Sequence, residues 1–199
     1  MPCFFCILCV PTAYPFLKRK RGKRGMKRSV VLWQVGGMLA VSVLGSLLHF
    51  LYDWTGTVFV APFSAVNEST WEHMKLFFFP AVLYAVVQYF FFRKEYPDFW
   101  CVKLVGVLTG LLLIPVLFYT LNGAFGKTPD WVNIAIFFVS VICAFLVEWR
   151  LFTAAPMRCA PIACIIVLTV LGACFVIFTF LPPKPPLFLD PVTKTYGIV

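Results

Sequence analysis

Apolar residues dominate this chain in five long runs, which short polar stretches separate. The runs cover residues 30–52, 71–92, 102–121, 131–152 and 160–181. Each is close to the roughly 20 residues that an α-helix needs to cross a hydrocarbon core of about 30 Å. Lipid cannot satisfy backbone hydrogen bonds, so single runs of this kind must be helical. The pattern therefore predicts an all-α protein, a polytopic membrane bundle of five transmembrane helices.

The overall composition supports the membrane interpretation. Of the 199 residues 61% are hydrophobic and only 13% are charged, which is not a soluble composition. The net charge of +9 suggests nucleic acid, but eight of the 17 basic residues lie between Lys18 and Arg28. Such a cluster before an apolar run is typical of a topology signal or of contact with anionic lipid. We expect the lipid bilayer as a partner and no nucleic acid; a protein partner or oligomer is not identified.

The short loops predict the orientation from their Lys and Arg content. With the N-terminus inside, the inner segments hold thirteen basic residues and the outer segments hold four. The N-terminus is therefore expected inside and, after five spans, the C-terminus outside. Glu148 and Arg150 then lie at the inner end of the fourth run, where they are expected to form a polar rim at the interface.

Both ends of the chain differ from the apolar middle. In residues 1–25 the apolar part is broken by Pro11 and Pro15, and the charges follow it, whereas in a signal peptide they precede it. We expect residues 1–25 to be a disordered extension or a mis-set start, and residues 26–181 to be the five-span domain. Residues 182–199 are rich in proline and large apolar residues, which predicts an ordered, extracytoplasmic tail.

The eight cysteines do not predict a disulfide framework. Cysteine inside or beside an apolar run behaves as a small apolar residue, and five fit this description: Cys101, Cys143, Cys159, Cys164 and Cys174. Cys3, Cys6 and Cys9 are regularly spaced, but no second pair of ligands lies nearby to complete a zinc site.

Ionisable residues gather where the first two runs meet. Residues 67–73 read Asn-Glu-Ser-Thr-Trp-Glu-His, and His49 and Asp53 end the preceding run. One interpretation is local: Ser69 and Glu72 form a helix-capping box, while Trp71 anchors in the interface and Lys75 extends to the surface.

The second interpretation is a functional site. Adjacent antiparallel helices bring the ionisable residues to a similar depth, and such groups in membrane proteins usually serve function. The candidates for a polar pocket are His49, Asp53, Asn67, Glu68, Glu72 and His73. Among them His49, Glu72 and His73 could hold a divalent metal ion, although no HExxH-type pair fixes them on one helix. A proton relay and a site for a polar head group are the alternatives.

Two stretches resemble an uncharacterised family of small multi-pass membrane proteins of Gram-positive-type bacteria. They are residues 49–54, His-Phe-Leu-Tyr-Asp-Trp, and residues 66–75, Val-Asn-Glu-Ser-Thr-Trp-Glu-His-Met-Lys; the ending is similar as well, with Pro186-Leu187-Phe188, Asp190-Pro191 and Tyr196-Gly197. The resemblance covers about Met26 to the end. It implies a location in the bacterial cytoplasmic membrane and no activity, and it marks Asp190 and Tyr196 as tail residues that could contact the polar cluster.

Motifs of common soluble enzymes are missing from the sequence. There is no Gly-rich phosphate loop and no GxSxG elbow. The leading hypothesis is binding or transport of a small polar solute or ion at an outward-facing polar pocket. One alternative is a membrane-embedded enzyme, with or without a metal, that acts on lipid or envelope precursors. The other is a structural or regulatory membrane subunit.

Overall fold

A computed structural model describes residues 24–198 of the chain. Within that range it contains no strand; its helices are α1 (Arg24–Thr55), α2 (Thr70–Phe92), α3 (Phe99–Phe125), α4 (Asp130–Thr153), α5 (Pro161–Phe180) and a short 3₁₀ helix, η2 (Pro186–Phe188). All five α-helices coincide with the predicted runs and are long and apolar enough to cross a membrane. The all-helical, five-helix prediction is confirmed at this level. The prediction for residues 1–25 lies outside the described residues, except that α1 already includes Arg24 and Gly25.

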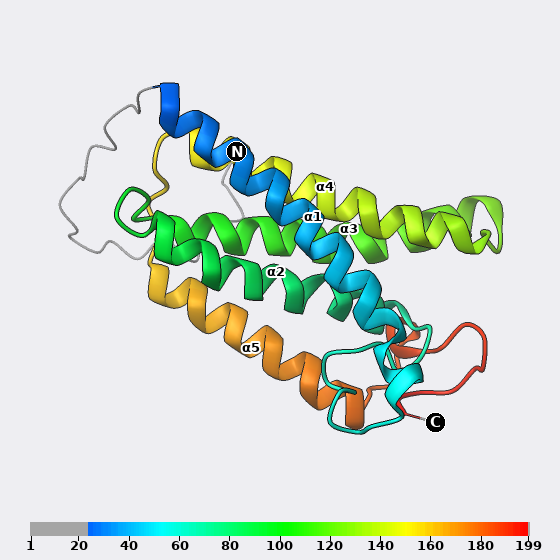
Figure 1. Cartoon of the computed structure of the whole chain (residues 1–199). Coiled ribbons are helices and arrows are strands. Elements are labelled where there is room, and N and C mark those ends of the chain that lie inside the picture. Colours follow the sequence, from blue (N-terminus) through cyan, green and yellow to red (C-terminus); the bar gives the residue numbers. More distant parts are fainter. Residues whose placement is uncertain (1–23, 199) are drawn as a thin grey trace.

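Helix α2 lies at the centre of the bundle. It packs against α1, α3, α4, α5 and η2. The start of α1 and the loops 93–98 and 154–160 lie at one end of the molecule, and the loop 56–69 and the tail 181–198 lie at the other (Figure 1). We call the second of these the tail end and the first the opposite end.

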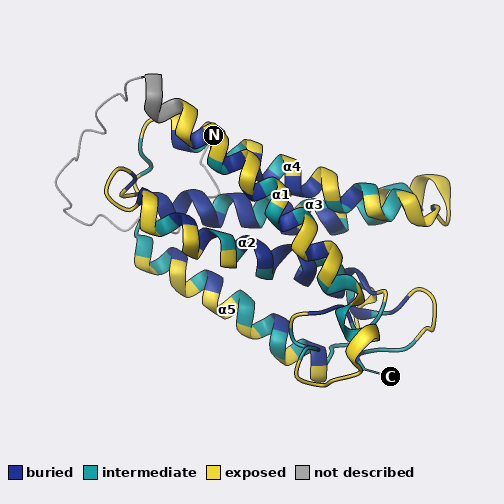
Figure 2. Ribbon diagram, in the orientation of Figure 1, coloured by how far each residue is buried: buried dark blue, intermediate teal, exposed yellow. Residues whose placement is uncertain are grey.

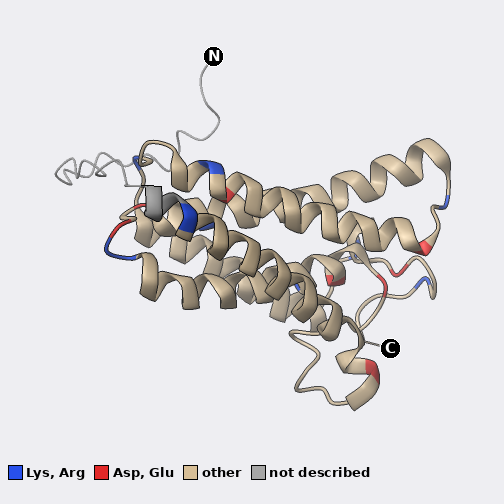
Figure 3. Cartoon of the chain, turned by 45° about the horizontal axis from the view of Figure 1, so that its top comes forward, with Lys and Arg blue, Asp and Glu red and all other residues tan. Residues whose placement is uncertain are grey.

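The outward faces of the helices are apolar. Large hydrophobic side chains are exposed along one stripe of α1, at Leu32, Leu39 and Val43, and along α5, at Ile162 and Ile166. Figure 2 shows exposed residues on the outside of these helices and buried residues between them. Charged residues are concentrated near the two ends of the bundle (Figure 3). An apolar belt with charged ends is the surface that a bilayer requires.

Helices α1 and α2 approach each other closely at Gly45. A Cβ atom at this position would lie 2.8 Å from the backbone oxygen of Leu76 and would also collide with the ring of Phe137. A backbone atom cannot move aside as a side chain can, so only glycine fits here. Small residues at helix contacts are the usual way in which membrane helices pack tightly. This contact brings the ends of α1 and α2 together at the tail end.

A buried ion pair joins α3 and α4 in the opposite half of the bundle. Lys103 Nζ lies 2.6 Å from Glu148 Oε2, and both side chains are almost completely inaccessible. The ammonium group also lies 5.2 Å from the ring centre of Phe145 and 5.6 Å from that of Tyr84. The prediction that Glu148 belongs to a polar rim with Arg150 is therefore wrong. Glu148 points inward because α3 supplies a partner for it, which the sequence of α4 alone does not reveal.

One disulfide links loop 154–160 to α3. It joins Cys101 to Cys159 across a sequence separation of 58 residues. The prediction that the cysteines beside the spans act only as apolar packing residues is therefore wrong for this pair. The pairing cannot be predicted from the sequence. Cys159 lies in the loop just before α5, and only the folded structure places that loop against the first turn of α3.

Breaking the buried pair should destabilise the protein strongly. Glu148→Gln leaves the Lys103 ammonium buried without a carboxylate, and removal of one member of such a pair costs about 3–5 kcal/mol. We expect a clear decrease in the midpoint of thermal unfolding in detergent. Lys103→Met in the same chain should restore most of the loss, because it removes the unpaired charge.

Arg150→Gln is the matched control, since it removes an exposed charge from the same helix. This variant should unfold within a few degrees of the original protein. A Glu148→Gln protein as stable as this control would contradict the assignment.

Candidate functional site

Ser69 begins α2 at the tail end. Its backbone is extended and its hydroxyl accepts a hydrogen bond from the Glu72 amide, as an N-cap should. The other half of the predicted capping box is absent. The Ser69 amide donates to Asn67 Oδ1 instead, and Glu72 Oε2 accepts a hydrogen bond from the Val66 amide. Glu72 thus holds the preceding loop against the first turn of α2.

Lys75 is the most completely buried charge at the tail end, with 0% of its side chain exposed. Its ammonium group lies 2.6 Å from Glu72 Oε2, and it donates to the Ala61 carbonyl at 2.7 Å and to the Thr179 hydroxyl at 2.9 Å. An ammonium group has three donors, and here each has an acceptor. The prediction that Lys75 extends to the surface is therefore wrong: loop 56–69, α2 and α5 are all held by one cation.

Trp71 also lies inside the protein, contrary to its predicted place in the membrane interface. Its ring packs on Phe175 at 4.4 Å and on Phe188 at 4.7 Å between centroids. Phe188 belongs to η2, so the tail folds back over the start of α2. Aromatic contacts of this kind stabilise by about 0.5–1.5 kcal/mol beyond the area that they bury.

The tail is fixed by polar contacts to the segment 67–69. Asn67 Nδ2 donates to the Gly197 carbonyl at 2.8 Å. The Asp190 carboxylate accepts from the amides of Val192 and Thr193, and the Glu68 amide adds a further hydrogen bond. Tyr196, which the sequence also singled out, donates to the Lys184 carbonyl within the tail. Asp190 and Asn67 therefore position the backbone of Glu68.

Three potential metal ligands converge beside this tail contact. They are His49 from α1, Glu68 from loop 56–69 and His73 from α2, and one ligand atom from each lies within 4.8 Å of the others. Glu68 lies between the histidines, with Oε2 3.5 Å from His73 Nε2 and Oε1 3.9 Å from His49 Nε2. The imidazole centroids are 5.3 Å apart. All three side chains are partly exposed, so the cluster is open to solvent at the tail end.

Hydrogen bonding fixes the orientation of the His73 ring. Its Nδ1 lies 2.9 Å from the Ser69 carbonyl oxygen; a carbonyl can only accept, so Nδ1 carries the proton. In a neutral ring Nε2 then holds a lone pair, and it faces a carboxylate oxygen that is also an acceptor. Two acceptors that face each other are satisfied by a proton on Nε2, by a bridging water molecule or by a metal ion. Metal-binding histidines usually have their second nitrogen bonded in this manner.

The other residues predicted for this pocket lie outside the convergence. Glu72, which the sequence assigned to the metal set with His49 and His73, is buried and engaged with Lys75. Asp53 is exposed at the end of α1 and is not part of the ligand group. Asn67 uses its side chain for the tail and for Ser69. The structure thus replaces Glu72 by Glu68 as the carboxylate beside both histidines.

Lys75 and Thr179 are the residues that sequence reasoning missed. A lysine one turn inside an apolar run suggested an exposed end, but a glutamate three residues earlier is an equally available partner. The three-residue spacing of Glu72 and Lys75 was therefore a signal for this contact in the sequence. No sequence signal marked Thr179, because its contact with Lys75 depends on how α5 packs beside α2.

Comparison with known proteins gives the class of the molecule but no activity. The model of a family of unknown function, DUF6512, matches residues 23–198. The chain belongs to this family. No curated protein and no solved structure matches it.

Protonation of Asp190 should loosen the tail. Burial alone would raise the pKa of this carboxyl, but the amides of Val192, Thr193 and Glu68 and the Thr193 hydroxyl lower it below the ordinary value of 3.8. A lowered pKa means that the ionised form stabilises the tail; this contribution is complete above pH 3.8 and is lost as the pH falls through the lower pKa of the folded state. Asp190→Asn should therefore speed hydrogen exchange of residues 188–198 at pH 7 by about tenfold, the value of a hydrogen bond to a charged group.

Mass spectrometry of the exchanged protein measures this effect. The difference between the variant and the original protein should shrink below pH 3.8. Asp130→Asn removes an exposed carboxylate at the start of α4 and should leave exchange of the tail unchanged. Equal exchange of the original protein and Asp190→Asn at pH 7 would argue against this role.

Proposed function

We propose that this protein is a multi-pass membrane protein that binds a divalent metal ion through His49, Glu68 and His73. The observation that supports the proposal most directly is the approach of His73 Nε2 to the Glu68 carboxylate at 3.5 Å, while Nδ1 of the same ring bonds to the Ser69 carbonyl. The metal prediction from the sequence is kept in changed form, with Glu68 in place of Glu72.

The spacing of the ligand atoms suits zinc. Zinc binds nitrogen and oxygen ligands at about 2.0–2.2 Å with tetrahedral geometry, which places two ligand atoms about 3.4 Å apart. The two distances involve different oxygens of Glu68, 3.5 Å from Oε2 to His73 and 3.9 Å from Oε1 to His49, so a shared site requires the carboxylate to turn and the histidines to approach each other. Glu68 lies on a loop and is half-exposed, so it can make that adjustment. Three protein ligands leave one position for water or a substrate.

Binding at one surface fits the bundle better than conduction through it. Large buried rings fill the space between the helices below the histidines, among them Phe77, Phe78, Phe145 and Phe175. The buried polar groups of the opposite half, Lys103 and Glu148, pair with each other. We therefore favour binding over the transport version of the sequence hypothesis.

The proposed orientation places this site outside the cytoplasm. The distribution of Lys and Arg puts the start of α1 inside and the tail outside, in a bacterial cytoplasmic membrane if the family resemblance holds. Metal from the surrounding medium could then reach the site without crossing the bilayer.

An enzyme acting on lipid is the second candidate. A shallow, open apolar surface on α1 is lined by Ser46, Phe50, Trp54 and Phe138 among others, beside the exposed stripe of this helix. Phe50 also packs against the His49 ring, at 4.8 Å between centroids. An acyl chain along this surface would place a polar head group near the histidines, which favours a substrate with a polar head and an apolar tail. This candidate would be supported if the protein cleaved a phospholipid only in the presence of zinc and if Glu68→Gln abolished the cleavage.

Zinc titration of the purified protein tests the proposal. After removal of metal by a chelator, calorimetry in detergent should show one saturable site per chain. Glu68→Gln and His73→Ala should each weaken it by at least about 100-fold, because even residues that only support a ligand cost 10- to 100-fold. Circular dichroism should confirm that both variants keep their helices.

Two controls separate this site from other groups that could take up zinc. Asp130→Asn removes an exposed carboxylate at the start of α4, and Cys164→Ser removes a thiol at the opposite end; neither should change the affinity. Absence of saturable binding, or equal affinity in Glu68→Gln, would refute the proposal.

A further inference from the structure

Three cysteine sulfurs meet at the opposite end of the bundle from the histidines. Cys101 lies in the first turn of α3, Cys159 in loop 154–160 and Cys164 in the first turn of α5. Cys101 and Cys159 form the disulfide described above, and the Cys164 sulfur lies 3.3 Å from that of Cys101. All three sulfur atoms lie within 4.8 Å of one another. Two of them suffice for a structural bridge, so the third requires a separate explanation.

We propose that Cys101, Cys159 and Cys164 form a thiol–disulfide exchange site. The Cys164 sulfur attacks Cys101 Sγ, a Cys101–Cys164 bond forms, and the Cys101–Cys159 bond breaks. Cys159 leaves as a thiolate and takes up the proton that Cys164 releases. One disulfide and one thiol are present before and after this step, so it needs no external oxidant or reductant.

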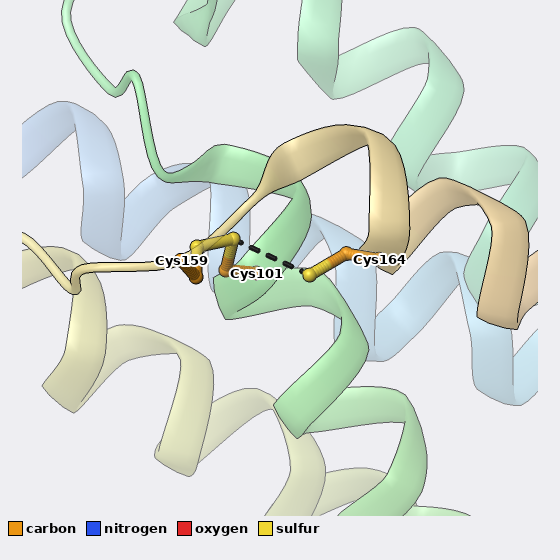
Figure 4. Close-up of side chains that lie close together, drawn as sticks. All are labelled: Cys101, Cys159 and Cys164. Carbon is orange, nitrogen blue, oxygen red and sulfur yellow. Dashed lines mark hydrogen bonds between the residues drawn. A yellow bond between two sulfur atoms is a disulfide. The ribbon is translucent and has the colours of Figure 1, made fainter. Parts of the chain in front are cut away.

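The arrangement of the sulfurs suits this step. Figure 4 shows the Cys101 sulfur between the other two, with Cys159 on one side and Cys164 on the other. Exchange requires the attacking thiolate and the leaving thiolate to be on different sides of the sulfur that is attacked. Cys101 is the sulfur in this central position, and Cys159 is the leaving group.

The three cysteines differ in how far they are buried. Cys101 and Cys164 are both buried, whereas Cys159 is partly exposed. After the exchange the disulfide joins the two buried sulfurs, and the free thiol is the partly exposed Cys159. This thiol is the one that a partner from solution can reach.

Cys101 and Cys164 lie in the first turns of helices of 27 and 20 residues, at the opposite end of the bundle from the histidines. On the proposed orientation this end also faces the cytoplasm, where disulfides are mostly transient and serve catalysis or sensing.

A small-molecule disulfide is the substrate class that fits. The released Cys159 thiol gives up its proton and attacks R–S–S–R, which forms the mixed disulfide Cys159–S–S–R; the leaving RS⁻ takes up that proton as RSH, so bonds and charge balance. The site is far from the histidine cluster and is independent of metal binding there.

Oxidised glutathione is a suitable probe. The full-length protein, purified in detergent without reductant, is incubated with it and quenched in acid, and its cysteine peptides are then mapped by mass spectrometry. The original protein should carry glutathione on Cys159 together with a Cys101–Cys164 disulfide. Cys164→Ser should form at least about tenfold less of this adduct, because Cys159 stays within its bridge.

Two further variants make the result decisive. Cys174→Ser removes a partly buried thiol from the same helix and should behave like the original protein. Incubated with the same oxidised glutathione, Cys159→Ser should form the Cys101–Cys164 disulfide and release two molecules of reduced glutathione, a test that does not depend on how well Cys164→Ser folds.

Two results would overturn the proposal. The first is equal glutathione labelling of Cys159 in the original protein and in Cys164→Ser, with no Cys101–Cys164 disulfide in any sample. The second is one zinc ion per reduced chain that Cys164→Ser loses, which would make the three cysteines a metal centre instead.

Discussion

The buried ammonium group of Lys75 is the interaction on which the tail end depends. A charge in a dry, apolar environment is tolerated only when its hydrogen bonds are complete. Lys75 meets this condition with one acceptor from its own helix, one from loop 56–69 and one from α5. The loop carries Glu68 and the helix carries His73, so the relative positions of these two side chains follow from that network.

The two buried ion pairs divide the bundle into two functional halves. Glu72 and Lys75 support the open, solvent-facing cluster at the tail end, while Lys103 and Glu148 connect α3 and α4 near the cysteines. Aromatic packing fills the space between them, from Phe77 and Phe78 to Phe145. The histidine cluster and the cysteine cluster thus lie at opposite ends of one small protein.

The helices could be predicted from sequence because length and hydrophobicity alone determine what can cross a bilayer. The neighbourhood of His49 and His73 could also be anticipated, since consecutive antiparallel helices bring their joined ends together. Which carboxylate lies beside the histidines had one local signal, the three-residue spacing of Glu72 and Lys75. The cysteine cluster had none, because its members come from α3, a loop and α5. Long-range packing thus decided the contacts that no local spacing predicts.

The dependence of the tail end on the last helix affects how the protein can be made. During synthesis α2 is complete long before α5, yet the third acceptor of Lys75 is Thr179 and the main partners of Trp71 are Phe175 and Phe188. A nascent chain that ends before α5 therefore leaves an ammonium group and an indole ring incompletely covered within the membrane. The tail end therefore cannot reach its final packing until residues 175–188 have been translated.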